Sequence, residues 1–174
     1  NSSANPYFKM FGDFNLDEYP EVLLWRTYDV SKGIVHNVNA YINSNGGNTG
    51  YTKGLVNSFV MANGLPIYAA GSGYAGDDSV QLVKKDRDSR LVLFMKAPGE
   101  LKFTEGDVSL EPHPMIISNA IENKYITGYP VKKGLSYVRS QVEGLQGTIG
   151  SIVFRAVEAY LNYIEASYLK NGSI

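Results

Sequence analysis

The sequence predicts one loop-rich domain that contains short helices, short strands and a single long helix near its carboxyl end. Its 174 residues include 18 Gly, 7 Pro and 13 Tyr, a composition that favours many turns and an amphipathic aromatic surface. A chain of this length buries roughly 70% of its unfolded surface, so a hydrophobic core is expected. Helical spacing of apolar residues is sustained only over residues 151–171, where Ser151 can cap the helix and Gly172 can end it.

The first half of the chain is expected to alternate loops with short elements. Residues 1–20 carry Pro and Gly without a sustained period, which predicts a loop with a short helical turn. Residues 21–30 are β-branched and aromatic, which predicts a buried strand or an extended segment. Five Asn and a Gly-Gly pair predict an exposed loop over residues 36–51. Thr52 can then cap a short helix that ends at Gly64.

The second half is expected to contain a strand, hairpins and the long helix. Residues 91–95 follow a polar turn and predict a strand, and Pro and Gly punctuate residues 97–134 as in hairpins and loops. The chain opens on Asn1 without a signal peptide. The last helix has an apolar face, and the sequence contains no other segment that is expected to pack against it. We therefore expect a fragment of a longer protein that has poor stability by itself.

Charge and cysteine content exclude several classes of function. The chain carries 16 basic and 17 acidic side chains, a net charge of −1, without the basic surface that nucleic acid or an anionic membrane requires. It has no Cys, which excludes disulfides, thiolate metal sites and Cys nucleophiles. No apolar run approaches the roughly 20 residues that span a bilayer.

A glycine fingerprint in "GLPIYAAGSGYAGDDSV" raises the possibility of a nucleotide site. Gly71, Gly73 and Gly76 match G-x-G-x-x-G, but a dinucleotide site needs a long helix directly after the glycines. The next residues are instead Asp77 and Asp78, whose carboxylates would repel a phosphate. We interpret these glycines as residues that allow positive φ in a surface loop.

Several stretches, in order along the chain, resemble the signature segments of a known family. They are "PEVLLWRTYD", "SFVMANGLPIYAAGSGYAGDD", "DRDSRL", "GYPVKKGL" and "IVFRAVEAYLNYIEA". They are similar to segments of the SusD/RagB family of Bacteroidota outer-membrane nutrient-binding lipoproteins. The sequence departs from the family pattern at Ser89, where Pro is usual, and at Ala156, Val157 and Ile164. Packing around the last helix is therefore expected to differ in detail.

This resemblance implies a fold, a location and partners. The fold is mainly α with long loops and short strands, a SusD-like fold built on tetratricopeptide-type helices. The chain would be part of one such domain, with a loop-rich middle over residues 1–150 and a repeat-type helix over residues 151–171. The resemblance also implies a lipid-anchored protein of the outer-membrane surface, with the anchor at an N-terminus that this chain lacks. It would cap a SusC-like TonB-dependent transporter and deliver glycan to it.

Catalytic and metal chemistry have little support in the sequence. The closely spaced carboxylates could hold calcium but lack EF-hand spacing, and the segment from Asp86 to Arg90 can satisfy itself as a local turn. His36 and His113 have no triad partners nearby and are interpreted as surface residues. Other acids fall in no recognisable catalytic frame: Asp29, Glu100, Glu105 and Glu111. No cofactor, catalytic residue or metal site is predicted.

Aromatic and amide side chains are the most informative candidates for a binding site. A sugar presents apolar C–H faces and a rim of hydroxyls, so its site combines aromatic faces with amide groups. The Asn-rich segment and the glycine loop supply this mixture, and the candidate ligand-binding residues are Tyr41, Asn43, Asn45, Asn48, Tyr51 and Tyr74. Ordinary turn chemistry explains them as well. Trp25 is interpreted as a core residue, and Tyr160, Tyr163 and Tyr168 are expected to pack against neighbouring helices.

The predicted function is non-catalytic binding of glycans, starch-like or other polysaccharides, at the cell surface. Three alternatives remain open at this point. The protein could bind peptides within the same architecture, because amide groups suit both ligands. It could be a glycoside hydrolase or esterase. The segment could also serve only the interface with the transporter, with cargo bound by another part of the protein.

Overall fold

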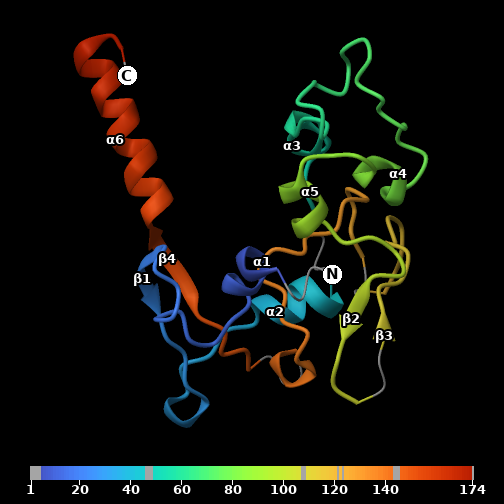
Figure 1. Ribbon diagram of the computed structural model, residues 1–174. Helices are drawn as coiled ribbons and strands as arrows, with labels where there is room; N and C mark the ends of the chain where they lie inside the picture. Colours follow the sequence, from blue (N-terminus) through green and yellow to red (C-terminus); the bar gives the residue numbers. More distant parts are fainter. Residues whose placement is uncertain are drawn as a thin grey trace.

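The computed structural model describes residues 5–45, 49–106, 109–120, 122, 124–142 and 146–173, and Figure 1 shows their arrangement. The helices are α1 (Pro6–Met10), α2 (Val38–Ala40), α3 (Lys53–Ser58), α4 (Val80–Lys84), α5 (Ser89–Phe94) and α6 (Ala156–Asn171). The strands are β1 (Val22–Arg26), β2 (Leu101–Phe103), β3 (Ser109–Leu110) and β4 (Ser151–Arg155). Single turns complete the set: 3-10 turns η2 (Val30–Lys32) and η4 (Arg139–Gln141), and the π-helical turn η3 (Tyr41–Asn45).

Two small hydrophobic clusters form the core. The first joins α3, α4 and α5 through Val56, Val83, Leu91 and Met95. The second joins α1 and α5 to the segment before η4 and is built on Phe8, Phe94 and Leu135. Because α5 contributes to both clusters, it holds the helices α3 and α4 against the part of the molecule that contains α1.

The strands pair in two short antiparallel ladders. β2 and β3 form a hairpin within the region where loops and hairpins were predicted. β1 pairs with β4 across most of the chain, with Trp25 opposite Ile152 and Arg26 opposite Ser151. A strand or extended segment was predicted over residues 21–30, and a strand forms over residues 22–26, but Leu23 is 54% exposed, so the expectation that the strand is buried is wrong. Trp25 is half-buried, and its ring nitrogen donates a hydrogen bond to Asp17.

The long carboxyl-terminal helix begins later than predicted. Residues 151–155 form β4 rather than the first turns of the helix, and Ser151 does not cap it. The β-branched pair Ile152 and Val153 suits a strand, and pairing with β1 decides between the two structures. The predicted end is confirmed, because Gly172 adopts φ 73° in the left-handed C-cap.

Helix α6 leaves the rest of the molecule at its first turn. Figure 1 shows it extending from β4 with no other described helix beside it. No residue of α6 is buried, and large apolar side chains on it are exposed: Val157, Tyr160, Leu161, Tyr163, Tyr168 and Leu169. The three tyrosines of α6 therefore pack against no neighbouring helix within the described residues.

Two other expectations about local structure are wrong. Residues 91–95 were predicted as a strand but lie in and just after α5, because Asp88 caps this helix by accepting a hydrogen bond from the Arg90 amide. The Asn-rich segment was predicted as an exposed loop, yet α2 and η3 cover residues 38–45. The short helix capped by Thr52 is confirmed, although α3 ends at Ser58 and not at Gly64.

The Asn-rich segment folds because its amides anchor another part of the chain. Asn39 and Asn43 are both fully buried. The Asn39 side-chain oxygen accepts a hydrogen bond of 2.9 Å from the Ser136 amide, and the Asn43 side chain donates one of 3.0 Å to the Ser136 carbonyl. The two Asn side chains thus satisfy both backbone hydrogen-bonding groups of Ser136, which lies some 95 positions away in the sequence. Turn propensity does not reveal this role.

A helix that spans a membrane must be both long and hydrophobic. Within the described residues, no helix is both long enough and apolar enough to cross a bilayer.

Candidate functional site

An aromatic cluster marks the junction between α1 and α5. Tyr7 and Phe11 meet edge to face with their ring centroids 5.4 Å apart. The Phe94 ring lies 5.6 Å from Tyr7 and 5.4 Å from Phe11, in both cases edge to face. Because all three rings come from the termini of short helices, their packing fixes how these helices meet.

Two cations flank the aromatic cluster. The ammonium of Lys133 lies 4.3 Å from the centroid of Phe11, and the guanidinium of Arg155 lies 5.1 Å from the same centroid. Contacts of this geometry stabilise a cation against the negative face of a ring. Arg155 also forms an ion pair of 2.8 Å with Glu21, whereas burial and the nearby charge of Arg155 lower the pKa of Lys133.

A first groove, here called the aromatic groove, lies between α1, α3 and α5. It encloses about 270 Å³. Four of its lining side chains are aromatic and two are cationic, and no carboxylate is among them. The lining residues are Tyr7, Tyr51, Leu55, Phe59, Arg90, Leu91, Phe94 and Lys133. The groove is therefore an aromatic surface with positive charge at its rim.

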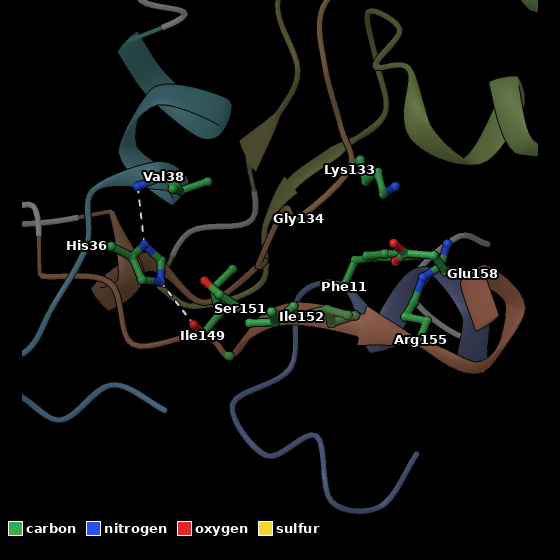
Figure 2. Close-up of a pocket in the computed structure, with 12 residues that line it drawn as sticks. Phe11, His36, Val38, Lys133, Gly134, Ile149, Ser151, Ile152, Arg155 and Glu158 are labelled. Carbon is green, nitrogen blue, oxygen red and sulfur yellow. Dashed lines mark hydrogen bonds between the residues drawn. The ribbon is translucent and has the colours of Figure 1, made fainter. Parts of the chain in front are cut away.

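A second groove, here called the β4 groove, runs along β4 and encloses about 340 Å³. Figure 2 shows Phe11, Lys133, Arg155 and Glu158 gathered at one end and His36 at the other. Lys133 lines both grooves, so they are neighbours on the surface.

His36 at the far end of the β4 groove has a structural role. Its Nε2 atom lies 3.0 Å from the Ile149 carbonyl, and its Nδ1 atom accepts a hydrogen bond from the Val38 amide, as Figure 2 shows. The ring nitrogen Nε2 therefore carries the proton. The residue is half-buried in the lining of the β4 groove, and His113 is exposed as predicted.

A buried ionic network supports the segment that carries Lys133. Glu100 accepts hydrogen bonds from Lys84 and from Lys132, the latter at 2.7 Å, and both lysines are buried. Burial raises the pKa of Glu100, but hydrogen bonds from Lys132 and Lys84 outweigh this effect and hold the pKa below its usual value. The Glu100 carboxylate thus neutralises both the Lys84 and the Lys132 ammonium groups. Because Lys132 is held in this way, the backbone next to Lys133 is fixed.

A second buried pair lies beside this network. Lys96 and Glu111 are 3.0 Å apart and almost fully buried. Burial lowers the pKa of Lys96 to about 8 and raises that of Glu111. The Lys96 ammonium also donates to the hydroxyl of Tyr125 at 3.2 Å. Glu100 and Glu111 therefore serve as internal ion-pair partners.

The structure brings one predicted site residue, Tyr51, into the aromatic groove. Its hydroxyl donates to the Phe94 carbonyl at 2.9 Å, and burial raises its pKa to about 12. Tyr41 is 39% exposed and lines neither groove. Asn43 is fully buried and bonded to Ser136, so its amide does not face a ligand.

The remaining predicted site residues do not join this groove. Tyr74 lies on the glycine loop, where its ring covers the Arg87 guanidinium at 5.3 Å and its hydroxyl donates to Asp77. Burial and the hydrogen bond to Asp77 raise the pKa of Tyr74 to about 12. Asn45 ends η3, and its side chain lies outside what the structure describes. Asn48 lies outside the described residues altogether.

The glycine loop adopts the conformation of a surface loop and is followed by a short helix. Gly71, Gly73 and Gly76 all adopt positive φ, as the surface-loop interpretation requires, and the helix that follows has only five residues. The Asp77 carboxylate accepts hydrogen bonds from the Lys53 ammonium and the Tyr74 hydroxyl. In the part of the chain that the structure describes, no group of three or more potential metal-ligating side chains is close enough to hold an ion.

Sequence reasoning missed most of the aromatic groove. Tyr7 stands in a segment without periodicity, Phe59 was assigned to the apolar side of a short helix, and Phe94 to a strand. Lys133 occurs in the quoted "GYPVKKGL" stretch, but its neighbour Lys132 is buried and paired whereas Lys133 is exposed. Only the tertiary structure separates these two adjacent lysines.

Comparisons with known proteins give a consistent result. The model of the SusD family matches residues 22–173. A crystal structure of a SusD-like protein from Bacteroides fragilis superposes with a TM-score of 0.61 and 21% sequence identity, which shows a shared fold. The match covers 90% of this chain and 34% of that protein, so the chain spans about a third of its length. A comparison with curated proteins found no match.

Proposed function

Because the chain belongs to the SusD family, we propose that it forms part of a non-catalytic surface protein that binds glycans. The protein would be lipid-anchored at the outer-membrane surface and would deliver oligosaccharide to a TonB-dependent transporter. Family membership and the shared fold support the general role of nutrient binding. The ligand, the anchor and the transporter partner are part of the proposal.

The aromatic groove is the observation that carries this proposal. Tyr7, Tyr51 and Phe59 line the groove and supply aromatic surface of the kind on which the C–H face of a sugar packs. A volume of about 270 Å³ lies near the lower end of small-ligand sites, so the groove suits one end or one unit of a longer chain. The cations at the rim can donate hydrogen bonds to ring hydroxyls.

The lining of the two grooves also suits binding better than cleavage. A glycoside hydrolase places two carboxyl groups on opposite sides of the scissile bond. Among the residues that line the aromatic and β4 grooves, one carboxylate occurs, that of Glu158. No observation favours a peptide ligand over a sugar, and peptide binding is retained as an outcome of the test.

Calorimetric titration of the natural full-length protein with a panel of polysaccharides tests the proposal. The same mixtures are analysed for cleavage products, and a set of oligopeptides is titrated in parallel. We expect saturable glycan binding without cleavage. Cleavage products would indicate a hydrolase instead, and binding that follows peptides rather than sugars would refute the glycan assignment.

Two groove variants locate the site. Tyr51→Ala removes a ring from the groove, and Leu55→Glu places a charged side chain in it from a position that is 46% exposed. Each change should weaken glycan binding about tenfold or more. Tyr68→Ala removes a ring that is 87% exposed and lines neither groove, and it serves as the control. Tyr41→Ala tests separately the contact that the sequence predicts at Tyr41.

A further inference from the structure

Lys133 is the one lysine among the residues that line the two grooves, and it has no counter-charge at ion-pair distance. Within the described residues, no carboxylate lies at ion-pair distance from its ammonium. Carboxylates pair instead with the following lysines: Lys9, Lys32, Lys53, Lys84, Lys96 and Lys132. An unpaired cation at the shared rim of two grooves is therefore a specific feature of this surface.

The nearest like charge makes the position of Lys133 electrostatically costly, although two aromatic rings stabilise its ammonium. Its ammonium lies against the rings of Phe11 and Phe94, at 4.3 and 5.8 Å from their centroids. The charged group that acts on it most strongly is Arg155, which has the same sign. An apolar surrounding strengthens the interaction of a charge with any counter-ion that enters. A bound anion would offset the repulsion from Arg155.

The other cations at this surface are already neutralised. Arg90 lines the aromatic groove but binds Asp88 through two nitrogen atoms, at 3.0 and 2.6 Å. Arg155 is paired with Glu21 at 2.8 Å. Lys133 is thus the lining cation of the aromatic groove that has no carboxylate partner within the described residues.

We propose that the aromatic groove binds the acidic group of an anionic oligosaccharide, with Lys133 as the residue that selects it. This inference rests on the proposed glycan-binding function and names the substrate class. The sugar ring packs on the rings of the groove, and its carboxylate or sulfate group accepts hydrogen bonds from the Lys133 ammonium. Carboxylate and sulfate share this chemistry, so the experiment separates them.

The test uses matched acidic and neutral probes with the natural full-length protein. Oligogalacturonides supply the carboxylate, and their methyl esters keep the same backbone without the charge. Carrageenan oligosaccharides supply the sulfate, and their desulfated forms are the neutral partners. We expect at least one acidic series to bind about tenfold or more tightly than its neutral partner, because a hydrogen bond to a charged group contributes that much. The preference should decrease as salt rises.

Variants of Lys133 assign the preference to this residue. Lys133→Met keeps the apolar stem and removes the charge, and it should abolish the tenfold preference for the acidic probe. Lys133→Arg should retain most of it. Lys85→Met is the matched control, because Lys85 is exposed at the end of α4 and lines neither groove. This control should leave the preference unchanged.

The outcomes separate this inference from the proposed function. If neutral glycans bind as tightly as acidic ones, or if Lys133→Met keeps the preference, acid selection is overturned while glycan binding stands. If no saccharide of either kind binds to the wild-type protein, both are overturned. A preference for one acidic series identifies whether the group is a carboxylate or a sulfate.

Discussion

The short helices α1, α3, α4 and α5 and the long helix α6 are stabilised in different ways. Helices α1, α3, α4 and α5 have five or six residues each, too few to be stable alone, and buried side chains hold them in place. Helix α6 has 16 residues, its own C-cap and no buried side chain. The comparison shows that one part of this molecule depends on tertiary contacts and the other on local sequence.

The largest effect is expected at Glu100, because it is shared by two buried lysines. Glu100→Gln removes the carboxylate and leaves Lys84 and Lys132 without this counter-ion. We expect the free energy of unfolding to fall by about 3 kcal/mol, as when one partner of a buried ion pair is removed. Chemical denaturation measures it. Glu165→Gln on the exposed surface of α6 should change it by less than about 0.5 kcal/mol.

Acid titration of the same variant sharpens this comparison. The pKa of Glu100 in the folded protein lies below the ordinary glutamate value of 4.5. Its stabilising contribution is therefore fully present above that value and is lost as pH falls through the lower folded pKa. Wild-type stability should fall more steeply below pH 4.5 than that of Glu100→Gln. Parallel curves would show that Glu100 is not the group that titrates.

Arg87 tests whether buried polar side chains hold the short helices together. Its guanidinium donates to three backbone carbonyls, those of Val56, Phe59 and Val83. Arg87→Met leaves them unpaired and should cost about 2 to 3 kcal/mol of unfolding free energy. Arg90→Met, which removes an exposed arginine paired with Asp88, should cost less than about 1 kcal/mol. Equal losses in urea denaturation would contradict the assignment.

The same contrast explains what could be predicted from the sequence. The end of α6 at Gly172 and the cap of α3 at Thr52 were predicted because a few adjacent residues determine them. The strand β4 was missed because its partner lies more than a hundred residues away. Asn39 and Asn43 suggested a turn, since composition cannot show that Ser136 would meet their amides. Predictions from local sequence were correct only where no contact with a distant segment changed the local structure.

The candidate site follows this pattern. Tyr51 was predicted as a ligand contact and does line the aromatic groove, although its role in binding stays a prediction. Tyr7 and Lys133 enter the groove from segments far from Tyr51 in the sequence. Adjacent lysines with the same local sequence are buried at position 132 and exposed at 133, and only the network around Glu100 decides which one is free.

The buried amides offer a smaller and more local test. Asn39→Ala removes the acceptor for the Ser136 amide and should lower the unfolding free energy by about 1 to 2 kcal/mol. Asn162→Ala on α6 changes an exposed residue to a better helix former, so it should be neutral or slightly stabilising. Thermal unfolding of both variants measures the difference. A neutral Asn39→Ala would mean that water replaces the lost acceptor.

The smallest effect in this chain, and the most informative about α6, is expected at Leu161. This side chain is 58% exposed, so Leu161→Ala should change the unfolding free energy of the 174-residue chain by less than about 0.5 kcal/mol. The solved SusD-like protein is about three times longer, and we predict that further helices of the natural full-length protein cover α6. There the same change should cost about 2 kcal/mol or more, because it would open a cavity. Equal small values in both proteins would show that α6 stays uncovered, and its order would then come from its own sequence alone.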